Sequence, residues 1–589
     1  MKHAIKTLLP LLLSLALLCA CGGKSPAAPS AAPAETAAPA PDPTPAAAPT
    51  PTPDPTPTPE PTPTRDASGA YLLSERGEAM LDEPWFADAA PAEGNARVFY
   101  EIFVGSFSDS DGDGTGDIRG IIDRLDYLND GDPTSGQSLG VEGLWLTPIY
   151  PAFSYHKYDA NDYCAVDGAF GSVEDVEELA EQCHRRGMKL ILDLPINHTG
   201  RGSAWFTSFL TAHRQGLTDD PWYDFYCWYP QGERAPAGRT FAQLSGTTDY
   251  YECNFSGDMP ELDFDQENVR QAVLDVALFW LNKGVDGFRF DAAKYIYFGD
   301  NEKSAEFWRW YLGELRAAFP EMFAVAEVWD GDGITDLYYP ALDCFDFSLS
   351  QAGGLIAETA KGGNVNRYTA YVDEYLERVE ALRGGAQLVP FIANHDTDRA
   401  AGYLSVDKWQ MQMAANLCIL SPGAPFLYYG EELGMRGSRG GANTDANRRL
   451  AMVWGDGDTV SDPVGTTYDA GKQIKQTAAD QMADGASLFS YYKKLIAVRQ
   501  ANPAIARGDF TALALDTSRM GGFVSTLDGK SVCVLHNTTG SPITLDLSQA
   551  TDLCFSGISA VIGQGNAVLE GTTVTLDGMT SAVLASIEN

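Results

Sequence analysis

Positive charge is scarce in this sequence. Its 589 residues include 41 lysines and arginines against 80 aspartates and glutamates, which gives a formal net charge of −39 at pH 7. A chain of this charge is repelled by the phosphates of nucleic acid and by anionic membrane surfaces. The charge therefore argues against both as binding partners and favours an uncharged substrate.

Cysteine pairs with CxxC spacing are absent as well. The ten cysteines are scattered without CxxC spacing, and no zinc or redox motif is visible among them. Cys227 and Cys253 share one segment, and Cys533 and Cys554 share another. Disulfides and buried free thiols are both compatible with this spacing.

Long apolar runs are limited to one short stretch at the start of the chain. TLLPLLLSLALL (7–18) follows the basic MKHAIK, and no later segment is apolar enough to span a bilayer. This order predicts a secretion signal over residues 1–20. LCAC (18–21) resembles a bacterial lipobox, which implies cleavage before Cys21 and acylation of that cysteine. Ordinary signal-peptidase cleavage with release is the alternative.

A low-complexity run rich in proline, threonine and alanine follows over residues 22–64. Such a run cannot build a core and favours the extended polyproline II conformation. We expect residues 21–70 to be a lipid-anchored linker. The expected location is the extracellular face of a bacterial cytoplasmic membrane, with the lipid on Cys21 as the membrane contact.

Short apolar segments alternate with amphipathic ones from residue 71 onwards. Eight segments are predicted strands: 98–104, 141–149, 188–197, 285–291, 323–329, 344–350, 388–396 and 425–432. SVEDVEELAEQCHRRG (172–187) is typical of the predicted helices, with Ser172 as a cap, acidic residues in its first turns and Gly187 at its end. Eight strands that alternate with helices predict a parallel (β/α)8 TIM barrel over residues 71–504.

Two departures from this alternation predict further domains. The connection after the third predicted strand is long and rich in Trp, Tyr, Gly and Asp, which predicts an inserted subdomain at about 198–265. From about residue 505, the sequence changes to short alternating strands separated by turns. This change predicts a C-terminal antiparallel β-sandwich domain over 505–589.

The predicted strand GVDGFRFD (284–291) ends in charged residues. Strand side chains alternate, so Phe288 and Phe290 should face the helices while Arg289 and Asp291 face the barrel mouth. Active sites of barrels form at the carboxyl ends of the strands. A structural Arg–Asp pair is the alternative for this strand taken alone.

Other predicted strand ends carry further polar groups: His198, Glu327, His395 and Asp396. Two carboxyl groups that differ in protonation are what glycoside hydrolysis requires. We expect Arg289 to keep Asp291 ionised, and we expect Asp291 and Asp396 to raise the pKa of Glu327.

Several motifs in the chain resemble, in the same order, those of the α-amylase family of retaining glycoside hydrolases. They are DLPINH (193–198), MPELDF (259–264), GFRFDAAKY (287–295), AEVW (326–329) and FIANHD (391–396). The resemblance covers residues 98–589 and implies double displacement on α-glucans. It implies that Asp291 is the nucleophile, Glu327 the general acid/base, and Asp396 the stabiliser of the transition state. Residues implied to position the nucleophile or bind substrate are Arg289, Tyr158, His156, His198, Lys294 and His395.

Departures from the family pattern concern specificity. Tyr295 stands where many α-amylases have His, which affects contacts beyond the cleaved bond. Ala292 follows the nucleophile, whereas α-1,6-specific relatives often carry Val there. We expect a monomeric α-amylase that cleaves internal α-1,4 bonds of starch and maltooligosaccharides. Alternatives are an oligo-1,6-glucosidase, a neopullulanase or cyclomaltodextrinase, an α-glucan transglycosylase and, remotely, a non-catalytic glycan-binding lipoprotein.

The stretch DSDGDGTGD (109–117) has the spacing of a cation-binding loop. Its expected ligands are Asp109, Asp111, Asp113, the carbonyl of Thr115 and Asp117. Oxygen donors at alternate positions suit Ca²⁺, and related amylases and oligo-1,6-glucosidases bind it at such a loop. We expect a structural Ca²⁺ here, with an acidic solvated turn as the alternative.

Overall fold

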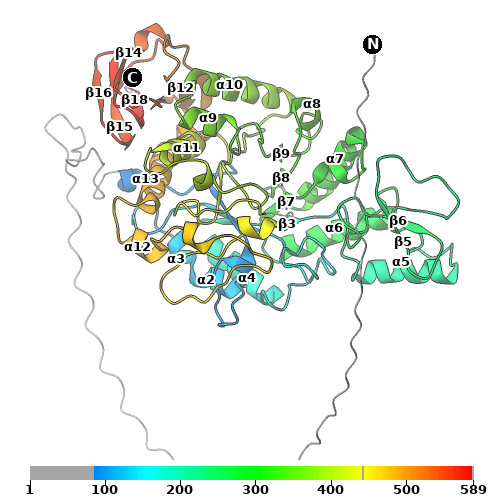
Figure 1. The fold of residues 1–589 in the computed structure, drawn as a ribbon. Helices are drawn as coiled ribbons and strands as arrows, with labels where there is room; N and C mark the ends of the chain where they lie inside the picture. Colours follow the sequence, from blue (N-terminus) through cyan, green and yellow to red (C-terminus); the bar gives the residue numbers. More distant parts are fainter. Residues whose placement is uncertain (1–84, 441–443, 587–589) are drawn as a thin grey trace, which may run out of the picture. The chain divides into compact units, whose positions relative to one another are not determined.

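The structure is a computed structural model that describes residues 85–440 and 444–586 (Figure 1). The predicted signal peptide, the predicted acylation site Cys21 and the proline-rich linker lie outside the described residues. Within the described residues, no helix combines the length and the apolar character needed to cross a membrane.

A parallel sheet of seven strands has the order β10-β1-β2-β3-β7-β8-β9. The strands are β1 (Phe99–Ile102), β2 (Gly143–Leu146), β3 (Lys189–Leu194), β7 (Gly287–Phe290), β8 (Phe323–Ala326), β9 (Asp343–Cys344) and β10 (Phe426–Tyr428). Residues 389–391 close the ring, because Val389 pairs in parallel with Phe345 and Phe391 pairs with Phe426. These bridges occupy the place of the seventh predicted strand, residues 388–396, and the fold is the predicted (β/α)8 barrel.

Side chains alternate between the barrel interior and the surrounding helices. Apolar side chains fill the interior: Phe99, Trp145, Ile191, Phe323, Val325, Phe345, Val389, Phe391, Ala424 and Phe426. Phe290 faces outwards, where its ring lies 4.6 Å from that of Trp308. Arg289 faces inwards, with its guanidinium 5.1 Å from the Trp145 ring centre. The predicted alternation along residues 287–291 is therefore present.

Helices surround this sheet (Figure 1). The α-helices outside the insertion are α1 (Trp85–Asp88), α2 (Ile118–Asp123), α3 (Leu125–Leu128), α4 (Val173–Arg185), α6 (Glu267–Asn282), α7 (Asn301–Ala318), α8 (Asp332–Thr335), α9 (Leu355–Ala360), α10 (Val365–Leu382), α11 (Gln410–Ile419), α12 (Ala478–Met482), α13 (Leu488–Ala501) and α14 (Pro503–Arg507). Short 3-10 turns include η1 (Val104–Ser106), η2 (Ala293–Tyr295), η3 (Ala400–Gly402), η5 (Asp445–Arg448), η6 (Ala470–Lys472) and η7 (Leu547–Gln549). Ser172 caps α4 as predicted, since its hydroxyl accepts from the backbone N–H of Asp175 at 3.2 Å.

An inserted segment lies between β3 and α6. It contains α5 (Ala204–Gln215) and an antiparallel sheet made of β4 (Trp228–Tyr229), β6 (Tyr250–Glu252) and β5 (Phe241–Gln243). Its aromatic rings pack on one another: the His213 ring stacks on Tyr223 at 4.1 Å and meets Trp228 edge-on at 4.5 Å. These rings help to form the core of the insertion.

Two antiparallel sheets form the C-terminal part of the chain. One contains β11 (Asp509–Ala512), β12 (Met520–Leu527), β13 (Lys530–Asn537), β18 (Thr580–Ser586) and β15 (Phe555–Gly563), and the other contains β14 (Ile543–Asp546), β17 (Thr573–Leu576) and β16 (Ala567–Glu570). Leu535 of the first sheet and Leu576 of the second belong to one buried cluster, as expected for a sandwich. The eight cysteines in the described part of the chain are free thiols.

Candidate active site

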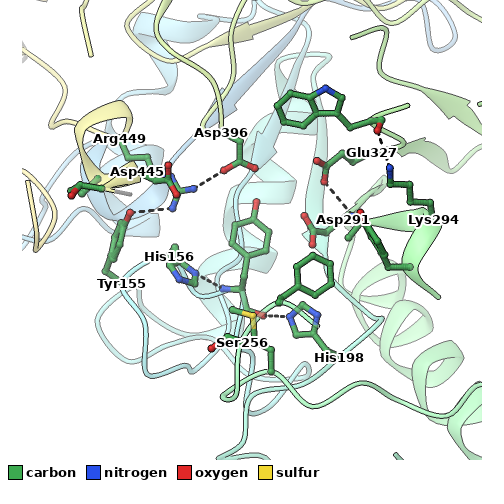
Figure 2. Close-up of a pocket in the computed structure, with 18 of the residues that line it drawn as sticks. Tyr155, His156, His198, Ser256, Asp291, Lys294, Glu327, Asp396, Asp445 and Arg449 are labelled. Carbon is green, nitrogen blue, oxygen red and sulfur yellow. Dashed lines mark hydrogen bonds and ion pairs between the residues drawn. The ribbon is translucent and has the colours of Figure 1, made fainter. Parts of the chain in front are cut away.

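A cavity of about 780 Å³ opens where the barrel strands end (Figure 2). Its lining includes Tyr158 after β2, His198 after β3, Asp291 after β7 and Glu327 after β8. Asp396, which follows the closing segment 389–391, lines it too. Figure 2 shows the three carboxylates around the same part of the cavity. Acidic side chains from three separate segments therefore converge.

Arg289 connects two of these carboxylates from beneath the cavity. Its Nη1 donates to Asp291 Oδ1 at 2.6 Å, and its Nη2 donates to Glu327 Oε2 at 2.8 Å. Nη1 also donates to both carboxylate oxygens of the buried Asp193, at 2.8 and 2.9 Å. The backbone N–H of Ala292 gives Glu327 Oε2 a further hydrogen bond at 3.2 Å. A single guanidinium thus fixes Asp291 and Glu327 relative to each other.

Burial and neighbouring charges give the three carboxyl groups different pKa values. Burial raises the pKa of Glu327 to about 7, with Arg289 opposing the rise and Asp291 and Asp396 adding to it. Burial also raises the pKa of Asp291, although Arg289 pulls it downwards. Burial opposes ionisation of Asp396, but the charges of His395 and Arg449 hold the pKa of that carboxyl well below its usual value.

These shifts differ in cause from the sequence-based expectation. Arg289 does favour the ionised form of Asp291, but burial outweighs it, so the pKa of Asp291 lies above its ordinary value. The pKa of Glu327 is raised as expected, but burial contributes more than its acidic neighbours. The sequence did not indicate how deeply the two groups lie, and depth determines the desolvation cost.

Asp396 is held from two sides by cations. Arg449 Nη2 donates to Asp396 Oδ1 at 2.7 Å, and His395 Nε2 lies 3.1 Å from Asp396 Oδ2. The other nitrogen of His395, Nδ1, lies 2.5 Å from Oε1 of Glu101 on β1. His395 is completely buried and is not part of the cavity lining; its two ring nitrogens contact Asp396, Glu101 and Tyr158.

Tyr158 and two histidines form one side of the cavity. Tyr158 stacks on His395 with ring centres 5.6 Å apart, and its hydroxyl donates to Asp193 Oδ2 at 2.9 Å. Burial lowers the pKa of His156 and of His198 to about 4 each, so both rings are neutral at pH 7. His198 Nε2 donates to the Tyr158 carbonyl at 3.1 Å, which leaves the buried Nδ1 of His198 as an acceptor without a protein partner.

Lys294 and two aromatic rings, those of Phe255 and Trp329, also line the cavity. Lys294 Nζ donates to the Trp329 carbonyl at 2.9 Å and contacts Asp330 at 3.1 Å. Trp329 is stacked on Phe347 at 4.6 Å and is 45% exposed, while Phe255 is 46% exposed. Phe255 and Trp329 both line the cavity, and each keeps exposed ring surface that is suited to stacking on sugar rings.

The family model described as alpha amylase, catalytic domain, matches residues 101–508. The chain belongs to the α-amylase family. Alpha-amylase 3 of Dictyoglomus thermophilum is 32% identical over 77% of this chain and 86% of its own length. An oligo-1,6-glucosidase of Bacillus cereus is 27% identical over 79% of this chain and 94% of its own. The solved structure titled Eubacterium rectale Amy13B has a TM-score of 0.78 at 30% identity, and covers 88% of this chain and 100% of that one.

Sequence reasoning did not assign roles to three residues of this α-amylase family site: Asp193, Glu101 and Arg449. Asp193 and Glu101 each interrupt an apolar strand with a charge, LILDL and FYEI, and that signal would have been sufficient to find them. Arg449 lies in a loop without periodic pattern. Its contact with Asp396, 53 positions earlier in the sequence, depends on how the intervening chain folds back, which no local signal indicates.

The predicted cation loop is only partly assembled. Asp109, Asp111 and Asp117 place ligand atoms within 4.8 Å of one another. Asp113 is not in this group, and its Oδ1 accepts from the backbone N–H of Thr115 at 2.7 Å. Asp117 also caps α2 by accepting from Gly120 N at 2.7 Å. Three carboxylates at this separation form a donor set that fits Ca²⁺.

Proposed function

We propose that this member of the family is an α-amylase that cleaves internal α-1,4 bonds of starch and maltodextrins with retention of configuration. The observation that supports this most directly is the arrangement of Asp291 and Glu327 on one guanidinium, beside Asp396 in the same cavity. Retaining glycosidases require one carboxylate that attacks and one carboxyl that donates a proton.

The proposed mechanism uses each carboxyl group once per half-reaction. Asp291 attacks the anomeric carbon while Glu327, with a pKa of about 7, protonates the departing glycosidic oxygen. Deprotonated Glu327 then takes a proton from water, which attacks the glycosyl–Asp291 ester and frees Asp291. Asp396 remains ionised and stabilises the positive charge that develops on the sugar in both transition states.

The preference for α-1,4 bonds within a chain rests on smaller features. Ala292 follows the nucleophile, and the exposed faces of Phe255 and Trp329 offer stacking surfaces for neighbouring glucose units. An uncharged polysaccharide also suits a chain with a net charge of −39. Oligo-1,6-glucosidase is the second candidate function, because a relative of that name covers most of this chain.

We also propose a structural Ca²⁺ and a lipid anchor. Asp109, Asp111 and Asp117 would hold the ion, and none of them lines the cavity. The lipobox-like LCAC supports acylation of Cys21 and attachment to the outer face of a bacterial membrane. Mass spectrometry of the mature N-terminus tests the anchor, because a Cys21→Ser variant should lose the lipid mass and leave the membrane fraction.

The decisive experiment is a product profile on amylose, pullulan and isomaltose, combined with Asp291→Asn. We expect internal scission of amylose, little action on isomaltose, and a loss of about three orders of magnitude or more in kcat for the variant. Asp275→Asn, on the exposed face of α6, serves as the matched control and should keep full activity. Rapid cleavage of isomaltose would instead identify an oligo-1,6-glucosidase. Glucan binding without any hydrolysis would identify a non-catalytic binding protein.

A further inference from the structure

We propose that Glu101 is a positioning residue of this site, which holds His395 as an imidazolium cation and thereby fixes Asp396 as an oriented carboxylate. The inference deepens the proposed function, because it explains how the site keeps the acid that stabilises the transition state. It rests on a buried row of three side chains: Glu101, His395 and Asp396.

Glu101 is the charged residue of β1, whose other residues are Phe99, Tyr100 and Ile102. It lies within β1, is 1% exposed, and its Oε1 lies 2.5 Å from His395 Nδ1. The backbone N–H of His395 donates to the same oxygen at 3.4 Å. A buried carboxylate is costly unless it is paired with an opposite charge. His395 is the residue in position to provide that charge.

Contacts on the far side of the ring require a second proton on His395. Its Nε2 lies 3.1 Å from Asp396 Oδ2 and 2.6 Å from the Tyr158 hydroxyl, whose proton is donated to Asp193. A neutral imidazole has only one N–H and would present a lone pair to one of the two carboxylates. With a carboxylate at each nitrogen, the arrangement is satisfied when both nitrogens are protonated. Consistent with this, burial lowers the pKa of His395, but Asp396 and Glu101 outweigh burial and raise it to about 10.

Other charges around the ring do not replace Glu101. The remaining groups that act on His395 or on its two carboxylate partners include Asp193, Arg289, Tyr158, His156, Arg449, Tyr428 and Glu431, together with Asp291, Glu327 and Tyr155, which act on Asp396. Asp193 and Arg289 form an ion pair, so their charges largely offset each other at the ring. Arg449 is a cation and disfavours a second one nearby. Glu431 has a pKa raised to about 8 by burial and is therefore mostly protonated at pH 7.

This arrangement gives Asp396 a cation at each oxygen. Arg449 binds Oδ1 and His395 binds Oδ2, so the carboxylate plane is fixed as well as its charge. Loss of the charge on Glu101 would allow His395 to become neutral near pH 7, and Asp396 would keep only one charged partner. Glu101 does not line the cavity, so it acts on a substrate only through His395.

Glu101→Gln tests the proposal, because the amide oxygen still accepts from His395 Nδ1 while the negative charge is lost. We expect the titration of His395, followed by ¹⁵N NMR of the histidine rings, to move down by about one to three pH units. The His395 signal is assigned by its loss in His395→Gln. We expect kcat to fall about tenfold at pH 8, less than for loss of a group that contacts the reacting atoms. The deficit should shrink as the pH falls and His395 regains its proton, while KM changes little.

Asp249→Asn provides the matched control, because Asp249 Oδ2 lies 3.0 Å from Nδ1 of the buried His213 in the insertion. It should change the environment of His213 and leave the pH dependence of kcat unaltered. The proposal is overturned if His395 is neutral at pH 8 in the unmodified protein, a measurement that needs no variant to fold. It is also overturned if Glu101→Gln leaves the His395 titration in place, or lowers kcat equally at every pH. A protein that is inert towards all glucans but carries a cationic His395 would instead contradict the proposed function.

Discussion

Glu327 can donate a proton only while its carboxyl group is protonated. Burial raises its pKa to about 7, so the acid form is present at neutral pH and is lost as the pH rises. We expect kcat/KM on amylose to fall about tenfold per pH unit on the alkaline side of this pKa. A pH profile between 5 and 9 with a soluble maltooligosaccharide measures it.

Glu327→Gln is the control for this assignment. The variant should lose the alkaline limb and most of its activity on starch. It should keep more activity on a maltosyl fluoride, whose leaving group needs no proton. A wild-type profile that stays flat up to pH 9 would contradict the assignment of Glu327 as the acid.

Individual site residues could be predicted from sequence where they occupy a recognisable position in the pattern of a strand. Arg289 and Asp291 follow from alternation along β7, and Glu327 follows from its place at the end of β8. What could not be predicted is their depth. The same Arg289 that was expected to dominate the ionisation of Asp291 is outweighed by desolvation, which depends on the packing of the whole barrel.

At the scale of elements, the seventh predicted strand shows that the existence of a strand is easier to predict than its boundaries. Residues 388–396 were expected as one strand, but only Val389 and Phe391 form ladder bridges. Pro390 lies between them and has no N–H to donate, while its carbonyl accepts from Phe426 N at 2.9 Å. The apolar pattern marks the position of the strand, and the proline limits its hydrogen bonding.

Strands β7 and β8 precede the proposed nucleophile and the proposed acid, and they leave no room for a side chain at Gly287. A Cβ there would lie 1.9 Å from the Phe323 carbonyl oxygen, and the φ angle of Gly287 is +154°. We expect Gly287→Ala to lower the free energy of unfolding by about 1–3 kcal/mol, because the two strands must separate. Urea unfolding followed by fluorescence measures it.

Gly313→Ala in α7 is the matched substitution, since nothing lies within 4 Å of its added Cβ. It should be neutral or raise the free energy of unfolding by up to about 1 kcal/mol, as alanine favours a helix. Equal stability of the two variants would show that β7 and β8 tolerate a side chain at Gly287.

One loop segment, residues 444–464, connects the cavity to the acidic loop 109–117. Asp445 and Arg449 line the cavity at one end of the segment. Further along the segment, Thr459 Oγ1 donates to Asp109 Oδ2 at 2.5 Å, and Ser461 Oγ donates to the Gly114 carbonyl at 2.6 Å. A cation bound by Asp109 would therefore order one side of the cavity as well as its own loop.

Chelation of Ca²⁺ tests this connection. If the concentration of free Ca²⁺ is about a hundred times its dissociation constant, we expect removal of the ion to lower the free energy of unfolding by about 3 kcal/mol. We also expect KM for long glucans to rise more than kcat falls. Calorimetry with and without chelator measures the first effect. Asp109→Asn should remove the response to chelator, and an unmodified protein with the same melting temperature under both conditions would exclude a structural ion.

At the scale of the molecule, the predicted order of catalytic barrel and C-terminal β domain could be obtained from sequence because each part has its own hydrophobic period. The extent of the contact between the barrel and the C-terminal β domain could not be predicted from sequence. Phe523, Val534 and Ile562 of the C-terminal sheets belong to the same buried cluster as the barrel helices. Alternation in a strand shows which face is buried but not what covers it.

Polar contacts reinforce this shared core. The buried side chain of Asn416 in α11 donates to Ser581 Oγ at 2.8 Å and to the Ile562 carbonyl at 3.3 Å, and accepts from the Tyr491 hydroxyl at 2.7 Å. Ser525 Oγ donates to the Ala504 carbonyl at 2.6 Å. Breaking such a junction would leave buried polar groups without partners on both sides.

We therefore expect the barrel and the C-terminal sheets to unfold in one cooperative transition. Asn416→Ala should lower the free energy of unfolding by about 1–3 kcal/mol, because the buried groups that hydrogen-bond to Asn416 lose their partner. It should leave kcat unchanged, because Asn416 does not line the cavity. Thr544→Val, on an exposed face of the smaller sheet, should change stability by less than about 0.5 kcal/mol. Differential scanning calorimetry decides the matter: two separated transitions in the unmodified chain would mean that the C-terminal sheets are an independent unit, whose removal the barrel would survive.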